Sequence, residues 1–252
     1  MTDPIVILDL FPRHFNVNGD CGNVLCLRRR LEWAGIPVTV LELEPGQAWP
    51  QERPDLVHLG GGSLAAQRAA LPELVANRER LAGWIAVGMP FLAVAGGFQL
   101  SMGTVSLSPG QAEAGLGVFA GSSDPAGSRI SGFAVARSEH GLIFGYQNLG
   151  QVVRLAPGQP ALGDLVHGHG NDSPAATEGA VSGSAIGSNL HGPLLPKNPA
   201  LADAMIRAAL SPRGIPYELG EAHAKADHYA AKGNETIVER LELGKTLTAP
   251  SA

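Results

Sequence analysis

Apolar and polar positions follow two alternating periodicities along the first hundred residues. Short, β-branched apolar runs typical of strands buried on both faces of a sheet lie at 5–10, 38–43, 55–59 and 91–95. Between them, apolar residues spaced three and four apart predict helices, one from about Asn23 to Gly35 and another over 64–87, interrupted near Pro72. This alternation favours an α/β fold with a mostly parallel, flavodoxin-like sheet flanked by helices.

The pattern changes between residues 104 and 190. Short apolar segments separated by glycine predict added hairpins there. Helical periodicity returns over 201–210 and from 221 to about 243, and residues 246–252 are expected to form a flexible tail. Because neither an internal repeat nor a long linker divides the chain, we predict one domain over residues 1–245.

Composition and charge narrow the function classes. Of the 252 residues, 44% are hydrophobic and 16% charged, as in a folded globule, and the net charge of −5 argues against a nucleic-acid partner. The longest apolar run is shorter than the roughly 20 residues that span a bilayer, so no membrane insertion is expected. Two cysteines cannot build a disulfide framework, and we expect a cytoplasmic protein.

Two predicted strands run directly into glycine clusters, where an open α/β sheet binds its ligands. Gly60-Gly61-Gly62 follows the third strand, and Gly96-Gly97 follows the fourth. Glycine lets the backbone approach a ligand and direct N–H groups at negative charge. A strand that turns through Gly-Gly into a helix also has the geometry of a nucleophile elbow, with Ala95 at its tip. Such glycine pairs are common, so they indicate a site only weakly.

Longer stretches raise the specificity of this pattern. Ala95-Gly-Gly-Phe-Gln99 resembles the Cys-Gly-Gly-Tyr-Gln elbow of class I glutamine amidotransferases of the CobB/CobQ-like group, and the chain as a whole resembles their GatD family. The stretches that carry the resemblance include 18–23, 60–67, 128–132, 145–148, 168–171, 190–198 and 213–217. The segment Leu190-His191-Gly-Pro-Leu-Leu-Pro-Lys-Asn198 is the most specific of them.

The resemblance implies a reaction. In such enzymes a cysteine attacks the side-chain amide of L-glutamine, a histidine moves protons, ammonia leaves, and water hydrolyses the γ-glutamyl thioester. Position 95 corresponds to the nucleophile and His191 to the general base. Backbone N–H groups around Gly61, Gly62 and Gly96 would bind the oxyanion.

The same resemblance assigns two further residues to substrate binding. Gln99 would line the pocket, and Arg129 would hold the α-carboxylate of glutamine. It also implies a heterodimer with a MurT-like Mur ligase subunit that amidates the D-glutamate of lipid II in peptidoglycan synthesis. ATP and Mg²⁺ would belong to that partner, so we expect no cofactor in this chain.

The chain departs from the family pattern at the position that matters most, because Ala95 replaces the cysteine. Either cysteine was replaced deliberately to trap a complex, or the natural protein lost its glutaminase activity. Leu64, Leu149 and Asn189 also differ from the aspartate, histidine and tyrosine usual in the family, and several such changes favour natural loss. Without a nucleophile the chain is expected to lack glutaminase activity.

Several alternatives stay open. The protein could be a pseudo-amidotransferase that acts as a scaffold or regulatory subunit, or an amidotransferase for a cobyrinic-acid-type acceptor. His167 and His169 form a candidate metal pair, but a glycine-rich hairpin explains them better, and we predict no metal site. Asp9 and Asp20 are expected to be structural caps rather than catalytic acids.

Overall fold

The protein is described by a computed structural model that covers residues 3–108 and 110–244. Its first sheet has the strand order β11-β12-β4-β3-β1-β2, and all neighbours are parallel except β11 and β12. The strands are β1 (Ile5–Leu10), β2 (Val38–Leu43), β3 (Leu56–Leu59), β4 (Phe91–Val94), β11 (Ala180–Ser182) and β12 (Ala185–Ser188). The expected α/β fold with a mostly parallel sheet is therefore confirmed.

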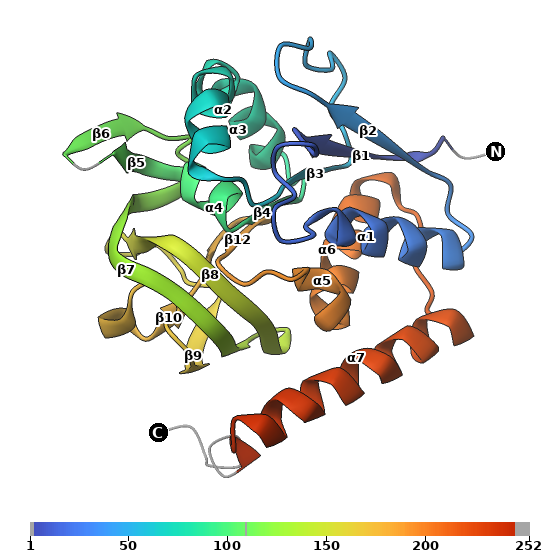
Figure 1. Cartoon of the computed structure of the whole chain (residues 1–252). Coiled ribbons are helices and arrows are strands. Elements are labelled where there is room, and N and C mark those ends of the chain that lie inside the picture. The colour runs from blue at the N-terminus through green and yellow to red at the C-terminus, as the bar shows by residue number, and fades with distance from the viewer. Residues whose placement is uncertain (1–2, 109, 245–252) are drawn as a thin grey trace.

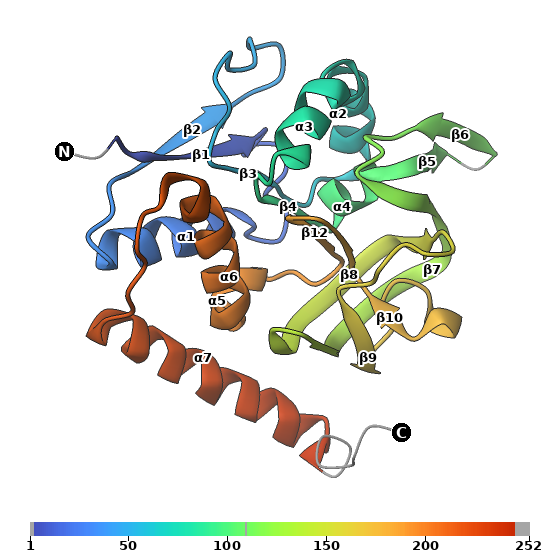
Figure 2. The ribbon, with the colours of Figure 1, turned by 180° about the vertical axis from the view of Figure 1, so that it is seen from behind.

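Helices cover both faces of this sheet (Figures 1 and 2). Alternate β1 residues point to opposite sides, so Ile5 and Ile7 join one apolar core and Leu8 and Leu10 the other. The first core includes α1 (Cys21–Trp33), α5 (Leu194–Lys197) and α6 (Pro199–Leu210), and the second includes α2 (Leu64–Ala76), α3 (Arg78–Ala86) and α4 (Gly96–Leu100).

The helical stretch predicted over 64–87 is divided, but not at the expected residue. Pro72 lies inside α2, and the break comes at Asn77, between α2 and α3. The Asn77 backbone leaves helical geometry at φ −106° and ψ 8°, and its side-chain amide donates to the carbonyl of Glu73 at 3.0 Å. The helix α2 therefore ends five residues after the proline, at Asn77.

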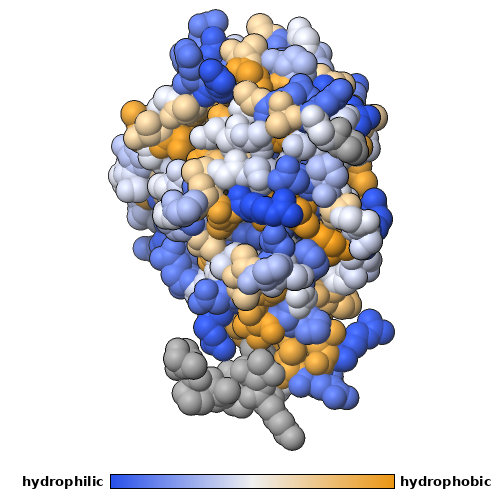
Figure 3. Space-filling model, turned by 90° about the vertical axis from the view of Figure 1, so that its left-hand side faces the viewer, coloured by the Kyte–Doolittle hydropathy of each residue, from blue (hydrophilic) through white to orange (hydrophobic). Residues whose placement is uncertain are grey.

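The glycine-rich middle of the chain forms a second sheet, which confirms the added hairpins. Its order is β10-β9-β7-β5-β6, with β8 paired to β7 along a long antiparallel ribbon. The strands are β5 (Met102–Ser108), β6 (Gln111–Ala114), β7 (Phe119–Ser138), β8 (Gly141–Leu155), β9 (Gly163–His167) and β10 (Thr177–Glu178). On the side of the molecule seen in Figure 3, hydrophilic and hydrophobic residues are interspersed.

The chain ends with the long helix α7 (Glu221–Arg240), which lies across the outside of α1 and α5 (Figures 1 and 2). Arg30 of α1 fixes it through an ion pair with Asp227, at 2.7 Å, and the same guanidinium binds Asp203 of α6. Within the described ranges, none of the helices is both long and apolar enough to cross a bilayer. The predicted tail, 246–252, lies outside those ranges, and the single-domain boundaries stay a prediction.

Candidate functional site

Three neighbouring strands end at the same edge of the first sheet, and their loops build the site. Gly60-Gly61-Gly62 follows β3, Ala95 follows β4, and the segment from Asn189 to His191 follows β12. In an open α/β sheet this carboxyl edge is where ligands bind. The strand order therefore places together three segments that lie far apart in the sequence.

Ala95 forms the sharp corner that the sequence predicts. Its backbone has φ 47° and ψ −111°, a conformation that costs strain in any residue with a β-carbon. Its N–H donates to the carbonyl of Ser188 at 2.7 Å, which fixes the corner to the end of β12. Gly97 must be glycine, because a β-carbon there would lie 2.3 Å from the carbonyl oxygen of Leu59. The corner has the geometry of a nucleophile elbow, although it carries a methyl group.

A hollow of about 390 Å³ opens above this corner. It brings together all the predicted site residues but one: Gly61, Gly62, Ala95, Gly96, Gln99 and Arg129. His191 is not part of this lining; it follows, three residues later, the Ser188 whose carbonyl accepts the N–H of Ala95. Six of the seven predicted residues therefore line one hollow, and the seventh, His191, does not line it.

Two backbone amides of the hollow are available to bind an anion. The N–H of Gly61 already donates to a carboxylate oxygen of Asp20 at 3.0 Å. The N–H groups of Gly62 and Gly96, by contrast, meet no acceptor in the described part of the chain. They are close neighbours, since a β-carbon on Gly96 would lie 2.9 Å from the nitrogen of Gly62. Gly62 and Gly96 are thus the candidate oxyanion donors, and Gly61 anchors the loop.

Asp20 has a different role from the one predicted. It precedes α1 but makes no capping hydrogen bond with its side chain. Its carboxylate is fully buried under the triglycine loop, where it accepts from Gly61, and burial raises its pKa. Behind it, Asp9 accepts from His58 at 2.8 Å, both side chains being buried. Asp20 thus holds the loop, and Asp9 holds His58 of β3, functions that neither residue's sequence context indicates.

Gln99 and Arg129 line the hollow with their polar groups partly engaged. The side-chain oxygen of Gln99 accepts from Gln67 at 3.3 Å, and Gln67 also donates to the carbonyl of Gly62 at 3.1 Å. The exposed Arg129 donates through Nε to Asn148 at 2.7 Å. The glutamines thus stiffen the floor, whereas the terminal nitrogens of Arg129 point to no acceptor within the described ranges.

His191 is held by backbone pairing with β8. Its N–H and C=O exchange hydrogen bonds with Tyr146 at 3.0 and 3.1 Å. Burial, assisted by the charge of Arg129, lowers the pKa of His191 to about 4, so the imidazole is neutral at pH 7. Its buried Nε2 has no hydrogen-bond partner in the described structure. A neutral imidazole with a free nitrogen can accept a proton.

Glu178 is a buried residue of the site that the sequence analysis missed. One carboxylate oxygen accepts from the Ser188 hydroxyl and from the Asn189 N–H, both at 2.8 Å, while Ser188 Oγ accepts from the Leu190 N–H at 3.0 Å. Burial raises the pKa of Glu178 to about 7. Glu178 therefore fixes the segment that leads from the elbow to His191. Its sequence neighbours, Thr177 and Gly179, indicate a turn rather than a site.

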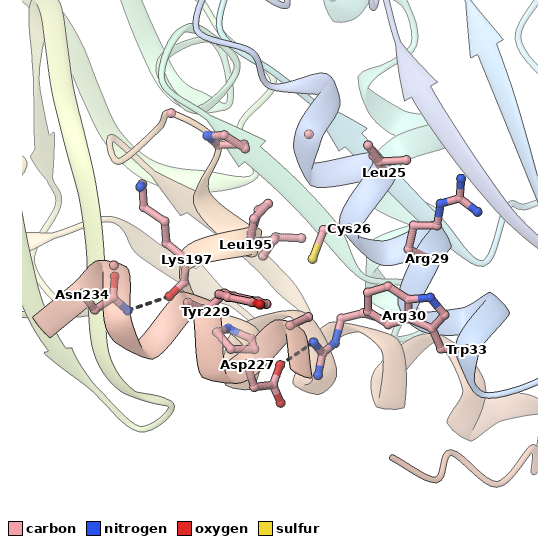
Figure 4. A pocket seen from close by; sticks show the side chains of 18 residues that line it. Leu25, Cys26, Arg29, Arg30, Trp33, Leu195, Lys197, Asp227, Tyr229 and Asn234 are labelled. Carbon is pink, nitrogen blue, oxygen red and sulfur yellow. Dashed lines mark hydrogen bonds and ion pairs between the residues drawn. The ribbon is translucent and has the colours of Figure 1, made fainter. Parts of the chain in front are cut away.

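A second hollow, of about 620 Å³, lies between α1, α5 and α7, away from the elbow. Figure 4 shows Trp33 and Tyr229 among its side chains, together with the Arg30–Asp227 ion pair and the 2.8 Å bond from Asn234 to the carbonyl of Lys197. These contacts attach α7 to the body of the molecule. Over the described residues, no group of three potential metal ligands is found, at His167 and His169 or elsewhere.

Comparison with known proteins identifies the family. Residues 6–199 match the model of the CobB/CobQ-like glutamine amidotransferase domain. Two curated relatives are named lipid II isoglutaminyl synthase (glutamine-hydrolyzing) subunit GatD. The Staphylococcus aureus protein is 32% identical over 91% of this chain and 93% of its own length. The Streptococcus pneumoniae protein is 30% identical over 81% of this chain and 80% of its own length. The chain belongs to the CobB/CobQ-like glutamine amidotransferases.

Solved structures support the fold of this amidotransferase chain. A chain of PurLQS from Thermotoga maritima has a TM-score of 0.54 at 14% identity, with 85% of this chain and all of that one covered. A glutamine amidotransferase from the same organism has a TM-score of 0.53 at 14% identity, with 98% of this chain and all of that one covered. The predicted class I amidotransferase fold is therefore confirmed. The matched residues 6–199 include both Ala95 and His191.

Proposed function

We propose that this chain is the glutaminase-type subunit of a lipid II isoglutaminyl synthase complex, and that it binds a carboxamide without hydrolysing it. The observation that carries the proposal is the elbow itself. Ala95 keeps the strained backbone of a nucleophile position, beside the free amides of Gly62 and Gly96, but has only a methyl side chain. A methyl group cannot attack a carbonyl carbon, so what the site retains is binding.

Neither cysteine of the chain substitutes for the missing thiol. Cys21 is exposed at the start of α1. Cys26 lines the hollow beneath α7, and burial raises its pKa to about 12, which keeps the thiol protonated. His191 therefore has no thiol to deprotonate in the described site. A ligase served by this subunit would take its nitrogen from free ammonia.

The partner follows from the named relatives. Both are subunits of lipid II isoglutaminyl synthase, which favours a peptidoglycan acceptor over a cobyrinic-acid-type one. We propose that a MurT-like ligase subunit completes the complex and supplies the site for ATP and Mg²⁺. This chain would contribute the ligand-binding hollow and a docking surface.

The experiment is lipid II amidation by the chain co-purified with its ligase subunit. The wild-type complex is expected to amidate lipid II with ammonium chloride but not with saturating L-glutamine, whereas the Ala95→Cys complex is expected to use both. Ala95→Ser serves as a matched control, because it adds a polar atom of similar size that is a weaker nucleophile. Glutamine use by the wild-type complex at the rate of Ala95→Cys would overturn the proposal.

A further inference from the structure

Both peptide bonds of Gly61 are fixed by segments outside the triglycine loop. In the first of them, the carbonyl oxygen of Gly60 accepts from the N–H of Gly97 at 2.9 Å. The N–H of Gly61 itself donates to the Asp20 carboxylate at 3.0 Å. In the second, the carbonyl oxygen of Gly61 accepts from the N–H of Val17 at 3.0 Å. Three of the four polar groups in these two peptide bonds are therefore engaged.

The fourth group, the N–H of Gly62, takes its direction from these contacts. The described part of the chain has no cis peptide bond, and in a trans peptide bond the C=O and the N–H point in opposite directions. Because Val17 holds the carbonyl of Gly61, the N–H of Gly62 points away from Val17. This N–H meets no acceptor within the described ranges, and Gly62 lines the elbow hollow. The loop therefore presents one free donor in a fixed direction.

The Asp20 carboxylate is an unfavourable group to bury. Its side chain is fully buried, and its oxygen Oδ1 has no hydrogen-bond partner among the described residues. Burial raises the pKa of this carboxyl, because the charged form is poorly solvated there. A side chain that served stability alone would avoid this cost, so the cost indicates that the contact with Gly61 has another use.

The turn that carries Asp20 is attached to the segment of α5. The side-chain oxygen of Asn23, in the first turn of α1, accepts from the N–H of Leu195 at 2.9 Å. Gly22 lies against Pro193, because a β-carbon at Gly22 would be 2.5 Å from the proline Cγ. The position of Asp20 is therefore set by contacts of α1 with the body of the protein, and not by the triglycine loop alone.

We propose that Asp20 is a positioning residue for carboxamide recognition, which holds Gly61 so that the N–H of Gly62 meets the side-chain oxygen of the ligand. This inference rests on the proposed function, because it concerns the carboxamide bound in the same hollow. Without Asp20 the N–H of Gly61 loses its acceptor, and the neighbouring peptide bond no longer keeps one direction. Affinity for the carboxamide then falls, while contacts with the rest of the ligand are retained.

The test compares L-glutamine with L-norvaline, which has a methyl group in place of the carboxamide and the same α-substituents. Both dissociation constants are measured by NMR titration of the wild-type chain and of each variant. Their ratio reports the contribution of the carboxamide, and a partial loss of folded protein leaves it unchanged. The wild-type chain is expected to prefer L-glutamine at least about tenfold.

Three variants separate positioning from folding. Asp20→Ala is expected to reduce the preference for L-glutamine about tenfold, the equivalent of one hydrogen bond. Asp20→Asn keeps an oxygen for the N–H of Gly61, and its amide nitrogen replaces an oxygen that has no partner either. Asp9→Ala is the matched control, because it removes a nearby buried carboxylate that binds His58 rather than the loop. Asp20→Asn and Asp9→Ala should both stay within about threefold of the wild-type preference.

Each outcome decides between the inference and the proposed function. A preference that Asp20→Ala retains, or that Asp20→Asn or Asp9→Ala lowers equally, would overturn the inference and leave the proposed function in place. Equal binding of both ligands by the wild-type chain would overturn the two together. A further measurement needs no variant: the assigned amide resonance of Gly62 in the wild-type chain should shift with L-glutamine and not with L-norvaline. Absence of that shift would also overturn the inference.

Discussion

The carbonyl oxygen of Ser188 accepts the backbone N–H of Ala95 at 2.7 Å, so the end of β12 and the corner after β4 form one unit. The hydroxyl of the same serine donates to Glu178 and accepts from the N–H of Leu190. His191 follows directly. Through Ser188, the positions of the corner at Ala95 and of His191 are therefore set together.

Glu178 should make the stability of the protein depend on pH. Because its pKa is raised from 4.5 to about 7 in the folded state, the folded protein keeps a proton between these pH values that the unfolded chain has released. The free energy of unfolding therefore falls as the pH rises from about 4.5 to 7, by up to about 3 kcal/mol from this group. Glu178→Gln, which keeps an acceptor oxygen but cannot ionise, should lose this slope.

Urea unfolding of both proteins at several pH values measures the effect. The pKa of His191 is lowered in the folded state, so its contribution rises over part of the same window, from about pH 4 to 6.5. That contribution is common to both proteins and cancels in the difference between them. A difference that stays constant from pH 4.5 to 7 would show that Glu178 does not titrate in this way. Glu178→Ala, which also loses the acceptor for Ser188 and Asn189, should be less stable than Glu178→Gln throughout.

Ala95→Gly should leave the protein as stable as wild type or stabilise it by about 1 kcal/mol. Glycine adopts the observed φ of 47° without the steric cost that alanine bears, and this gain outweighs its greater freedom in the unfolded chain. Ala93→Gly, two residues earlier in the extended strand β4, is the control and should destabilise. The two variants are compared by thermal unfolding. Equal losses in both would mean that the corner at Ala95 is not strained.

Ala95→Cys should raise the pKa of His191. In the wild-type chain burial and Arg129 hold this pKa at about 4. A thiolate at position 95 would stabilise the imidazolium electrostatically, and we expect a rise of at least about one pH unit. Histidine NMR titration measures it, with the resonance assigned from a His191→Gln sample. An unchanged pKa would show that positions 95 and 191 are not coupled.

The sequence predicted the corner and the loop of the site, because glycine clusters at the ends of apolar strand patterns indicate both. The Gly-Gly pair after the fourth apolar run indicated the corner at Ala95, and the triglycine run indicated the loop beside it. Both follow from local rules, since a sharp turn and a close backbone approach require glycine. The resemblance at 190–198 then added His191, which no periodicity would have indicated.

The residues that support the site were not predictable in this way. Glu178 and Asp20 act through bonds to segments 10 and 41 residues away along the chain, to Ser188 and Gly61. Such pairings depend on which strands are neighbours in the sheet, and local composition does not determine that. The position of the helix break, at Asn77 rather than Pro72, was not predicted either.

The central claim is that the elbow is intact and lacks only its thiol. The direct measurement is ammonia release from saturating L-glutamine by the purified wild-type chain, Ala95→Cys, and Ala95→Cys combined with His191→Ala. We predict release by Ala95→Cys at least about a thousandfold above wild type, and its loss in the double variant. Hydrolysis by the wild-type chain at a comparable rate, or none by an Ala95→Cys protein that binds the amide, would contradict the account.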